Sequence, residues 1–239
     1  MDLAIVIPVL NEADNIAPLL AEIDATLAAE GGYEMIVVDD GSTDATAAVL
    51  DDCSGRYPQL QVIRHAGRRG QSAAIVSGVL AARASLIATL DGDGQNDPAD
   101  IKRLYDTLRQ AAATVWLANG YRRQRRDSWL RRLSSRVANA VRGFVLGDHT
   151  PDTGCGLKVF RRDRFLGLPR FDHMHRFLPA LLQAQGGEVV SIEVKHRERS
   201  RGQSKYGVHN RLWVGLVDLF GVLWLRRRAI RPVIEKEEE

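Results

Sequence analysis

The first half of the chain alternates short apolar runs with longer segments of helical spacing, and this alternation limits the possible folds more than any other feature. Leu3–Val9 is a continuous apolar run, typical of a strand covered on both faces of a sheet. Similar strands are expected at Met35–Val38, Leu60–Ile63, Leu86–Leu90 and Thr114–Ala118, with helices at Asp14–Ala29, Asp44–Leu50, Gln71–Arg83 and Asp100–Gln110. Strands that alternate with helices pair in parallel, so the pattern predicts an α/β fold with a doubly wound sheet.

Composition sets broad limits. The chain has 239 residues, enough for one large domain or two small ones. Hydrophobic residues make up 45% and charged residues 26%, as in an ordinary globular protein, and a net charge of +3 is too small to indicate nucleic-acid binding by itself. Cys53 and Cys155 form no disulfide or metal-binding pattern, which favours a reducing compartment. The first residues lack the basic region of a signal peptide, so we expect a cytoplasmic protein.

The second half contains two amphipathic or apolar segments with many arginines. Ser128–Leu146 carries apolar residues on one helical face and arginines on much of the other. A helix near Arg176–Gln185 and a strand at Glu188–Val194 follow. Arg211–Arg228 contains an apolar run that Asp218 interrupts, and it is shorter than the roughly 20 residues of a membrane-spanning helix. Both segments therefore favour helices that lie at an interface, and packing on the rest of the chain or on a second subunit is the alternative.

Polar residues gather where the expected parallel strands end. Ligands of open α/β sheets bind outside the carboxyl ends of the strands. The polar residues at those ends are Asn11, Glu12, Asp39, Asp40, Arg64, His65, Asp91 and Asp93. Each of them alone can be explained as a turn residue, but their repetition at four strand ends indicates a binding site at this edge.

The acidic cluster Asp91-Gly-Asp93-Gly-Gln95 indicates a particular kind of metal site. An EF-hand loop starting at Asp91 would need glycine and glutamate where Asn96 and Lys102 stand. No dinucleotide fingerprint follows the first strand, and no P-loop is present. Two carboxylates and an amide are hard oxygen ligands that suit Mg²⁺ or Mn²⁺, which usually also bind water and substrate phosphate. Asp91, Asp93 and Gln95 are therefore the predicted metal ligands.

The motifs also carry a family resemblance. The stretches IVIPVLNEADNI, IVVDDGSTDAT, TLDGDGQNDP, NGYR, DTGCGLKVF and RSRGQSKYG occur in this order over residues 3–207. In these stretches the chain resembles the inverting family 2 glycosyltransferases, and within them the polyprenyl-phosphate, dolichol-phosphate mannose synthase-like branch. The resemblance implies a GT-A (Rossmann-like) nucleotide-sugar-binding fold with C-terminal amphipathic interface helices. The expected organisation is a catalytic domain over 1–206 that includes the helix at 128–146, a surface or packing helix over 207–231, and a disordered tail over 232–239.

The resemblance also implies roles for individual residues. Pro8, Asn11, Glu12, Asp39, Asp40 and Asp91 match positions that bind the nucleotide, and Asp91, Asp93 and Gln95 match the metal and diphosphate site. Arg122, Arg199, Ser204 and Lys205 match positions near the donor and acceptor phosphates. The expected catalytic residues are Asp93, Arg122, Arg199 and Lys205. Turn formation is the alternative for Asp40, with Ser42 or Thr43 as the helix cap, and a solvated charged loop is the alternative for Arg199 and Lys205.

The implied reaction moves one sugar from a UDP- or GDP-linked donor to a polyprenyl phosphate. A divalent cation, Mg²⁺ or Mn²⁺, would offset the charge on the leaving nucleoside diphosphate. The acceptor phosphate is already ionised at pH 7, so no strong general base is required. We therefore expect no essential carboxylate outside the metal and nucleotide sites. His173 and His175 are interpreted as packing or acceptor-channel residues, Asp152 as shaping the acceptor side, and Cys155 as a small packed residue rather than a nucleophile.

The expected partners follow from the substrate. A polyprenyl tail stays in the bilayer, so we expect peripheral attachment to the cytoplasmic face of the inner membrane, and a homodimer is compatible with it. No nucleic-acid partner is expected. Two alternatives stay open: a family 2 glycosyltransferase that acts on a glycan or protein hydroxyl, and a non-catalytic protein that binds membranes or nucleic acid through its arginines.

Overall fold

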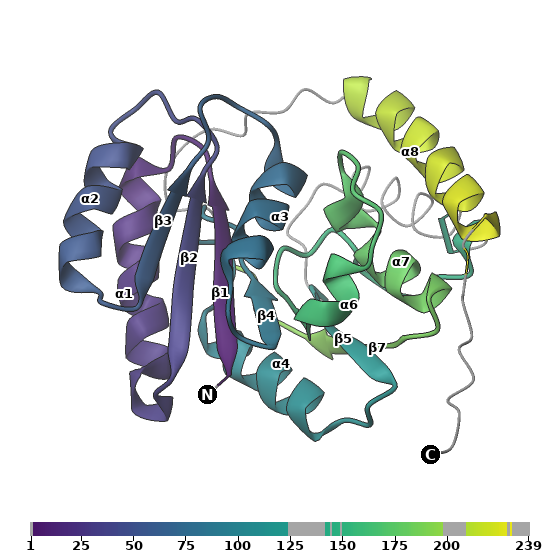
Figure 1. Ribbon diagram of the computed structural model, residues 1–239, viewed down its shortest axis with the longest axis horizontal. Helices are drawn as coiled ribbons and strands as arrows, with labels where there is room; N and C mark the ends of the chain where they lie inside the picture. Colours follow the sequence, from purple (N-terminus) through teal and green to yellow (C-terminus); the bar gives the residue numbers. More distant parts are fainter. Residues whose placement is uncertain are drawn as a thin grey trace, which may run out of the picture.

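A seven-stranded sheet forms the centre of the protein. The computed structural model describes residues 2–123, 142–143, 145–148, 150–197, 209–228 and 230. The strand order is β3-β2-β1-β4-β6-β5-β7 (Figure 1). The strands are β1 (Leu3–Val9), β2 (Tyr33–Asp39), β3 (Leu60–Arg64), β4 (Leu86–Thr89), β5 (Val115–Tyr121), β6 (Lys158–Arg161) and β7 (Glu188–Glu193). The mixed α/β fold is the one expected from the sequence.

Helices connect the strands. They are α1 (Ala13–Leu27), continued by a 3₁₀ turn η1 (Ala28–Glu30), then α2 (Thr46–Arg56), α3 (Gln71–Ala81), α4 (Ala99–Gln110), α6 (Arg162–Leu166), a second 3₁₀ turn η2 (Met174–Arg176), α7 (Leu178–Ala184) and α8 (His209–Arg227). Every strand and helix expected in the first half is present, with ends displaced by a few residues. The expected helix at 128–146 lies mostly outside the described residues, as do the tail at 232–239 and the segment 198–208.

The strand β1 is apolar throughout because both of its faces are covered. Leu3, Ile5 and Ile7 belong to the hydrophobic cluster that includes side chains of α1 and α4. Ala4 and Val6 belong to a second cluster on the other face, with side chains of α3 and α7. Parallel pairing of β1 with both β2 and β4 places the ends of these strands at one edge. The alternation of strands and helices therefore brings the acidic segments that follow β2 and β4 to the same edge of the sheet.

The sheet departs from the expected parallel pairing at β6. This strand lies between β4 and β5 and runs antiparallel to both, with Val159 opposite Ala88 on one side and Ala118 on the other. It is only four residues long and comes from the DTGCGLKVF stretch. A strand this short, with Lys158 and Arg161 at its ends, has no periodic pattern that a sequence analysis would recognise. Its position brings the 152–157 loop beside the acidic end of β4.

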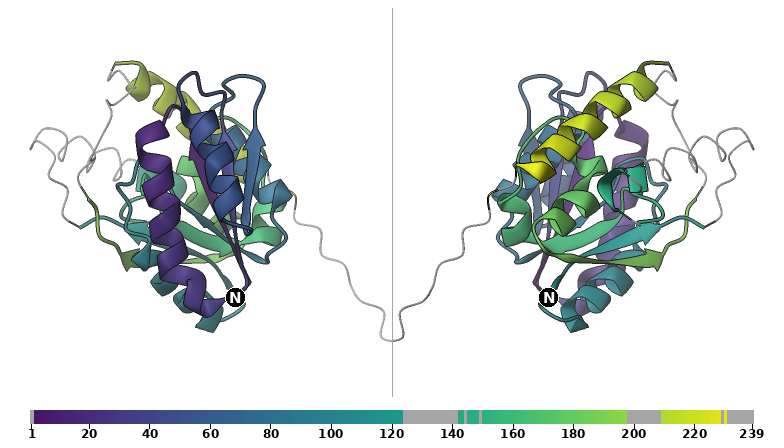
Figure 2. Two further views of the ribbon diagram at one scale, coloured as in Figure 1. Left: turned by 90° about the vertical axis from the view of Figure 1, so that its left-hand side faces the viewer. Right: turned by 90° about the vertical axis from the view of Figure 1, so that its right-hand side faces the viewer.

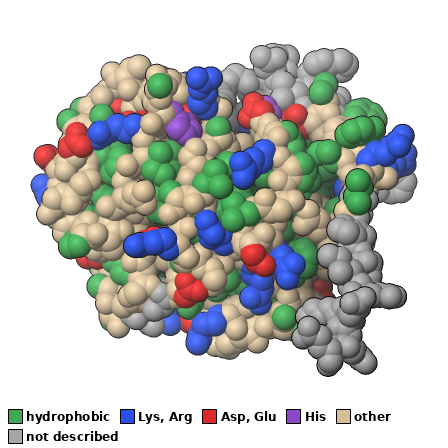
Figure 3. All heavy atoms as spheres, viewed as in Figure 1, with side chains coloured by type: hydrophobic (Ala, Val, Ile, Leu, Met, Phe, Trp, Pro, Cys, Tyr) green, Lys and Arg blue, Asp and Glu red, His purple; other side chains and the backbone are tan. Residues whose placement is uncertain are grey.

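The last helix, α8, lies across the outside of the domain beside α7 (Figure 2). Its inner face is buried through Leu219 and Val222. Its outer face leaves Val217, Phe220 and Trp224 60%, 66% and 62% exposed. Figure 3 shows hydrophobic side chains and a group of basic side chains next to one another along this edge. Among the described residues, no helix is long and apolar enough to cross a membrane.

Candidate functional site

The acidic turn after β4 is packed closely against its neighbours. Gln71 at the start of α3 donates its side-chain amide to Asp91 Oδ1 at 2.8 Å. A Cβ atom on Gly156 would overlap the Asp91 carboxylate, so only glycine permits this approach of the 152–157 loop. A Cβ atom on Gly92 would lie 2.6 Å from a methyl group of Val9. The glycines of this region therefore allow the turn, the end of β1 and the loop to meet.

Two carboxylates of this turn lie close enough to influence each other. Burial, and then the charge of Asp93, raise the pKa of the Asp91 carboxyl to about 6. Asp93 Oδ1 accepts a hydrogen bond of 3.2 Å from the backbone amide of Gln95. A cation between Asp91 and Asp93 would relieve their repulsion, so the donor set fits a divalent metal ion.

The protein supplies only part of a coordination shell. Within the described ranges, no group of three or more His, Cys, Asp or Glu side chains could hold a metal ion. A site at Asp91 and Asp93 would therefore take its other ligands from Gln95, water and a bound phosphate. This division is the usual one for Mg²⁺, which keeps several waters and few protein carboxylates.

The loops after β1 and β2 form one hydrogen-bonded unit. The amide of Asn11, a residue with φ of 53°, donates to Ser42 Oγ at 2.8 Å, and the amide of Glu12 donates to Thr46 Oγ1 at 2.9 Å. The amide of Ser42 donates in turn to Asp39 Oδ1 at 2.9 Å. The structure thus brings Asn11, Glu12 and Asp39, three of the residues expected at the nucleotide, to the same edge of the sheet.

Asp40 has a different environment from its neighbour Asp39. Its Oδ1 accepts from the amide of Arg69 at 2.8 Å and lies 2.7 Å from His65 Nδ1, and its Oδ2 accepts from the amide of Gly70 at 2.7 Å. His65 Nε2 is 2.9 Å from Ser77 Oγ on α3. Asp40 therefore orders the loop that follows β3.

Asp40 does not cap α2, nor do Ser42 and Thr43. The amide of Thr46, the first residue of that helix, instead donates to Asp44 Oδ1 at 3.0 Å. Asp40 therefore does not stabilise the turn into α2, as the alternative interpretation expected. It binds the loop after β3 instead.

Arg122 is held by a carboxylate on the opposite side of the site. Its Nε donates to Asp152 Oδ2 at 2.7 Å and its Nη2 to Asp152 Oδ1 at 3.1 Å. Burial disfavours the charged form of Arg122 and lowers its pKa. The Asp152 carboxylate outweighs this effect, so the pKa of the guanidinium lies above its usual value. The pair joins the end of β5 to the loop before β6, which fixes Arg122 beside the acidic turn.

Lys158 is a buried cation that the sequence analysis did not identify. Its side chain is 4% exposed, and its ammonium donates to the carbonyl oxygens of Thr153, at 3.1 Å, and Cys155. Burial lowers the pKa of the Lys158 amine, and nearby groups that include Asp91 counteract that effect. Lys158 therefore stabilises the 152–157 loop through these carbonyls and adds positive charge next to the acidic turn.

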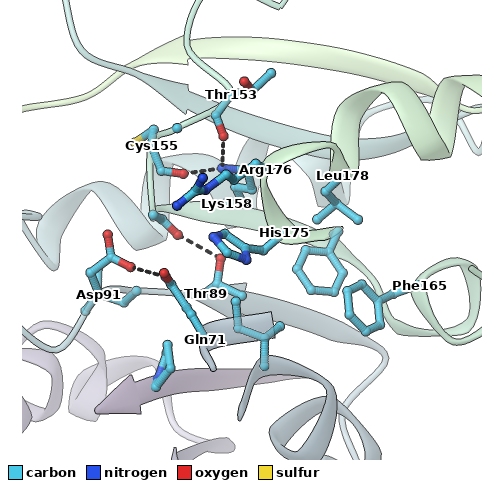
Figure 4. A pocket seen from close by; sticks show the side chains of 16 residues that line it. Gln71, Thr89, Asp91, Thr153, Cys155, Lys158, Phe165, His175, Arg176 and Leu178 are labelled. Atoms are coloured by element: carbon cyan, nitrogen blue, oxygen red, sulfur yellow. Dashed lines mark hydrogen bonds between the residues drawn. The ribbon is translucent and has the colours of Figure 1, made fainter. Parts of the chain in front are cut away.

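A cavity of about 200 Å³ opens beside Asp91 (Figure 4). The residues around it divide into a polar side with Asp91, Gln71, Lys158, His175 and Arg176 and an apolar side with Ile75, Phe160, Phe165 and Leu178. Pro8, expected at the nucleotide, also lines it. Gln71, Lys158 and Arg176 therefore line the cavity together with the predicted residues Pro8 and Asp91. Of these three, only Lys158 lies in one of the motifs, DTGCGLKVF.

The histidines and Cys155 agree with their expected packing roles. His175 Nδ1 lies 2.7 Å from Ser72 Oγ, which also accepts from the His175 amide at 3.4 Å. Burial, and then the charges of Arg176 and Lys158, lower the pKa of His175 to about 3. Cys155 is buried, and burial raises the pKa of its thiol, which disfavours a nucleophilic thiolate.

Part of the predicted site lies outside the described residues. Arg199, Ser204 and Lys205 belong to the segment 198–208. Their positions relative to Asp93 and Arg122 therefore stay predictions.

A family model described as Glycosyl transferase family 2 matches residues 4–166. A dodecaprenyl-phosphate galacturonate synthase from Rhizobium johnstonii is 34% identical over 237 residues, which cover 97% of this chain and 69% of the relative. An undecaprenyl-phosphate 4-deoxy-4-formamido-L-arabinose transferase from Edwardsiella ictaluri is 35% identical over 208 residues, or 86% of this chain. The match spans 63% of that relative's length.

Solved structures show the same fold at low sequence identity. A glucosyl-3-phosphoglycerate synthase from Mycobacterium tuberculosis, in complex with Mn²⁺, UDP-glucose and glycerol 3-phosphate, superposes with a TM-score of 0.65 at 20% identity and covers 94% of this chain and 79% of its own. A mannosyltransferase from Pyrobaculum calidifontis, in complex with GDP-mannose and Mn²⁺, superposes with a TM-score of 0.66 at 21% identity. The match covers 97% of this chain and 66% of that one.

Proposed function

Because the chain belongs to glycosyl transferase family 2, we propose that it transfers a single sugar, with inversion, from a nucleoside-diphosphate sugar to a polyprenyl phosphate. One observation carries the choice of acceptor. The two relatives described above are named for different sugars, galacturonate and 4-deoxy-4-formamido-L-arabinose, yet both names contain a polyprenyl phosphate. The acceptor class is thus the feature that these names share.

The donor binds at the edge where β1, β2 and β4 end. Pro8, Asn11, Glu12 and Asp39 contact the nucleoside, and Asp40 contributes by holding the loop after β3. This assignment is supported by the hydrogen bonds that join the loops after β1 and β2. A UDP or GDP donor is expected, since solved proteins of the same fold carry UDP-glucose or GDP-mannose.

Asp91, Asp93 and Gln95 hold a divalent cation, Mg²⁺ or Mn²⁺, together with the donor diphosphate. When bound, such an ion acts as a Lewis acid that offsets the charge on the departing nucleoside diphosphate. Asp91 must lose its proton to act as a ligand, and its raised pKa of about 6 makes this step sensitive to pH below neutrality. Gln71 orients Asp91 by donating to Oδ1.

The basic side of the site orients the reacting phosphates. Arg122, held by Asp152, presents a fixed positive charge next to the acidic turn, and preorganised charge of this kind stabilises charge that develops in a transition state. Arg199, Ser204 and Lys205 complete the phosphate site. An ionised acceptor phosphate attacks the anomeric carbon directly, so no residue is needed to remove a proton from it.

The protein works at the cytoplasmic face of the inner membrane, attached peripherally. Support for this placement comes from α8, whose outer face exposes Val217, Phe220 and Trp224. Arg226 and Arg227 lie in its last turn, and Arg228 follows it. Apolar side chains beside arginines suit the boundary between acyl chains and anionic headgroups. The helix expected at 128–146 provides a second contact, and a homodimer is compatible with both.

A donor screen tests the proposal. Purified protein is incubated with Mn²⁺, farnesyl phosphate and a panel of UDP- and GDP-sugars, and nucleoside diphosphate release is recorded with and without the lipid. Release that requires the lipid and disappears in Asp93→Ala is expected. Release that instead requires a glycan or protein hydroxyl, or no release from any donor, would contradict the proposal.

A further inference from the structure

We propose that Arg176 binds the phosphate group of the polyprenyl acceptor, and that the turn which carries it is positioned from two sides by His173 and His175. This inference rests on the proposed function and adds a phosphate-binding residue to it. Arg176 lies outside the motifs that indicated Arg122, Arg199 and Lys205. It is identified by its place in the cavity beside Asp91 (Figure 4).

The first argument is the distribution of charge in the cavity. Lys158 and Arg176 supply positive charge on its polar side, against the single carboxylate of Asp91. In the proposed function, Asp91 is neutralised by a divalent cation, so the cavity is left with a net positive charge. Such a cavity suits an anion. An arginine remains charged at every physiological pH and can bind a phosphate through two parallel hydrogen bonds.

The second argument separates the roles of the two cations. The ammonium of Lys158 is committed to the carbonyl oxygens of Thr153 and Cys155 and is almost fully buried. Arg176 is only half-buried, and its side chain extends into the cavity between Lys158 and His175 (Figure 4). Of these two cations, Arg176 is therefore the one that a ligand entering from outside meets.

The third argument concerns direction. The donor approaches from the ends of β1, β2 and β4. Arg176 comes from η2, next to α7, and α7 packs against α8. Asp218 on α8 lies 3.0 Å from His173 Nδ1, three residues before Arg176. The turn thus adjoins the helix whose outer face is proposed to meet the lipid, which favours the acceptor phosphate over the donor diphosphate.

The turn itself is held in an unusual backbone conformation. His173 has φ of 62°, a left-handed conformation that residues other than glycine seldom adopt. Met174 is buried in the core next to it. His175 completes the anchor on α3, because its amide donates to Ser72 Oγ at 3.4 Å and its Nδ1 lies 2.7 Å from the same oxygen. Contacts on both sides thus determine where Arg176 points, and His173 and His175 act as positioning residues.

The test compares Arg176 with a nearby arginine. Arg176→Gln, Arg176→Lys and the exposed control Arg170→Gln are assayed with the donor identified by the screen and farnesyl phosphate as acceptor. We expect Arg176→Gln to raise the KM for farnesyl phosphate roughly 10- to 100-fold while the KM for the donor changes less than about twofold. Arg176→Lys should keep part of the affinity, because it retains the charge without the paired hydrogen bonds. Arg170→Gln should change neither constant.

A fourth variant, Asp218→Ala, tests the positioning of the turn. It should raise the KM for farnesyl phosphate by less than Arg176→Gln does, again without an effect on the donor. An unchanged acceptor KM in Arg176→Gln, a rise confined to the donor KM, or an equal rise in Arg170→Gln would each overturn the inference.

These outcomes differ from failure of the proposed function. In that case the wild-type protein would transfer no sugar to farnesyl phosphate from any donor. Direct titration with farnesyl phosphate, followed by tryptophan fluorescence, then decides the inference, since weaker binding to Arg176→Gln than to Arg170→Gln supports it and equal binding overturns it.

Discussion

The acidic turn after β4 and the basic residues around it are built in opposite ways. Asp91 and Asp93 lie two residues apart on one turn, and burial, together with the charge of Asp93, raises the pKa of Asp91 to about 6. Arg122, Lys158 and Arg176 come from three segments that are distant in sequence. Asp152 holds the guanidinium of Arg122, and backbone carbonyls hold the ammonium of Lys158.

The two sets of residues differ in how their charges are balanced before a ligand binds. The acidic turn keeps an unfavourable concentration of negative charge that a cation would relieve. Arg122 and Lys158 are already held by protein oxygens, so their positive charge is oriented before a phosphate arrives. A bound cation would thus stabilise the acidic turn further, whereas the contacts that hold Arg122 and Lys158 are already present in the free protein.

The largest expected effect tests the acidic side. Asp93→Ala should lower kcat for sugar transfer by roughly 10³-fold, because a metal ligand that offsets leaving-group charge is lost. Steady-state rates at saturating Mn²⁺ measure the effect, and circular dichroism checks that the fold is intact. The exposed Asp51→Asn, which alters a surface pair with Arg64, serves as the control. Retention of more than about a tenth of the wild-type rate in Asp93→Ala would mean that the turn is not a metal site.

The next effect tests the basic side through stability. Asp152→Asn should lower the free energy of unfolding by about 3 kcal/mol, because it leaves the buried guanidinium of Arg122 without its carboxylate. Urea denaturation measures the change. Asp163→Asn, which removes an exposed partner of Arg164, should cost less than about 1 kcal/mol.

A double variant tests whether Arg122 and Asp152 stabilise the fold as a pair. Asp152→Asn combined with Arg122→Gln should recover part of the lost stability, since the uncompensated charge is then gone. If the single and double variants were equally unstable, Arg122 and Asp152 would not act as a pair.

A third prediction concerns the pH dependence of the turn that carries Arg176. Burial lowers the pKa of His175 to about 3 in the folded protein, whereas the imidazole of the unfolded chain takes up a proton near its ordinary pKa of 6.5. The stability that neutral His175 contributes is therefore complete above pH 6.5 and is lost as the pH falls. Between pH 7 and pH 5 the loss should be about 2 kcal/mol.

The measurement is the difference in unfolding free energy between the wild-type protein and His175→Gln. This difference should shrink by about 2 kcal/mol on going from pH 7 to pH 5, because the variant lacks the titrating group. A difference that stays constant with pH would show that His175 is not held neutral, and would weaken the description of the turn.

The smallest expected effect is a loss of membrane binding, and it distinguishes the outer face of α8 from its buried face. Phe220→Ala should reduce binding to vesicles that contain anionic lipid by roughly tenfold, because it removes an exposed apolar side chain from the proposed lipid face. Its unfolding free energy should change by less than about 0.5 kcal/mol. Leu219→Ala on the buried face should destabilise the protein by about 2 kcal/mol or more. Unchanged vesicle binding in Phe220→Ala would assign the outer face to another partner.

Prediction from sequence succeeded where the determining interactions are local. The strand β1 and the helices α1 to α4 follow from apolar periodicity, and Asp91 and Asp93 follow from a short motif after a strand. Lys158 and Arg176 were missed as site residues, because a single cation in a motif or beside a histidine carries no periodic or spacing signal. The hydrogen bonds of Asp40 to the amides of Arg69 and Gly70 carry no local signal either, because they join residues 29 and 30 positions apart.

The sequence by itself therefore determined the α/β architecture, the edge of the sheet where the polar loops gather and the acidic residues at that edge, because strand ends and motifs are set by neighbours in the chain. Only the tertiary structure decided which cations face those acids. The antiparallel insertion of β6 brings Lys158 to Asp91, Asp152 fixes Arg122 across the site, and the turn between α3 and α8 directs Arg176 into the cavity. Each of these placements depends on contacts between segments far apart in sequence, and the order of residues along the chain does not encode such contacts in any local pattern.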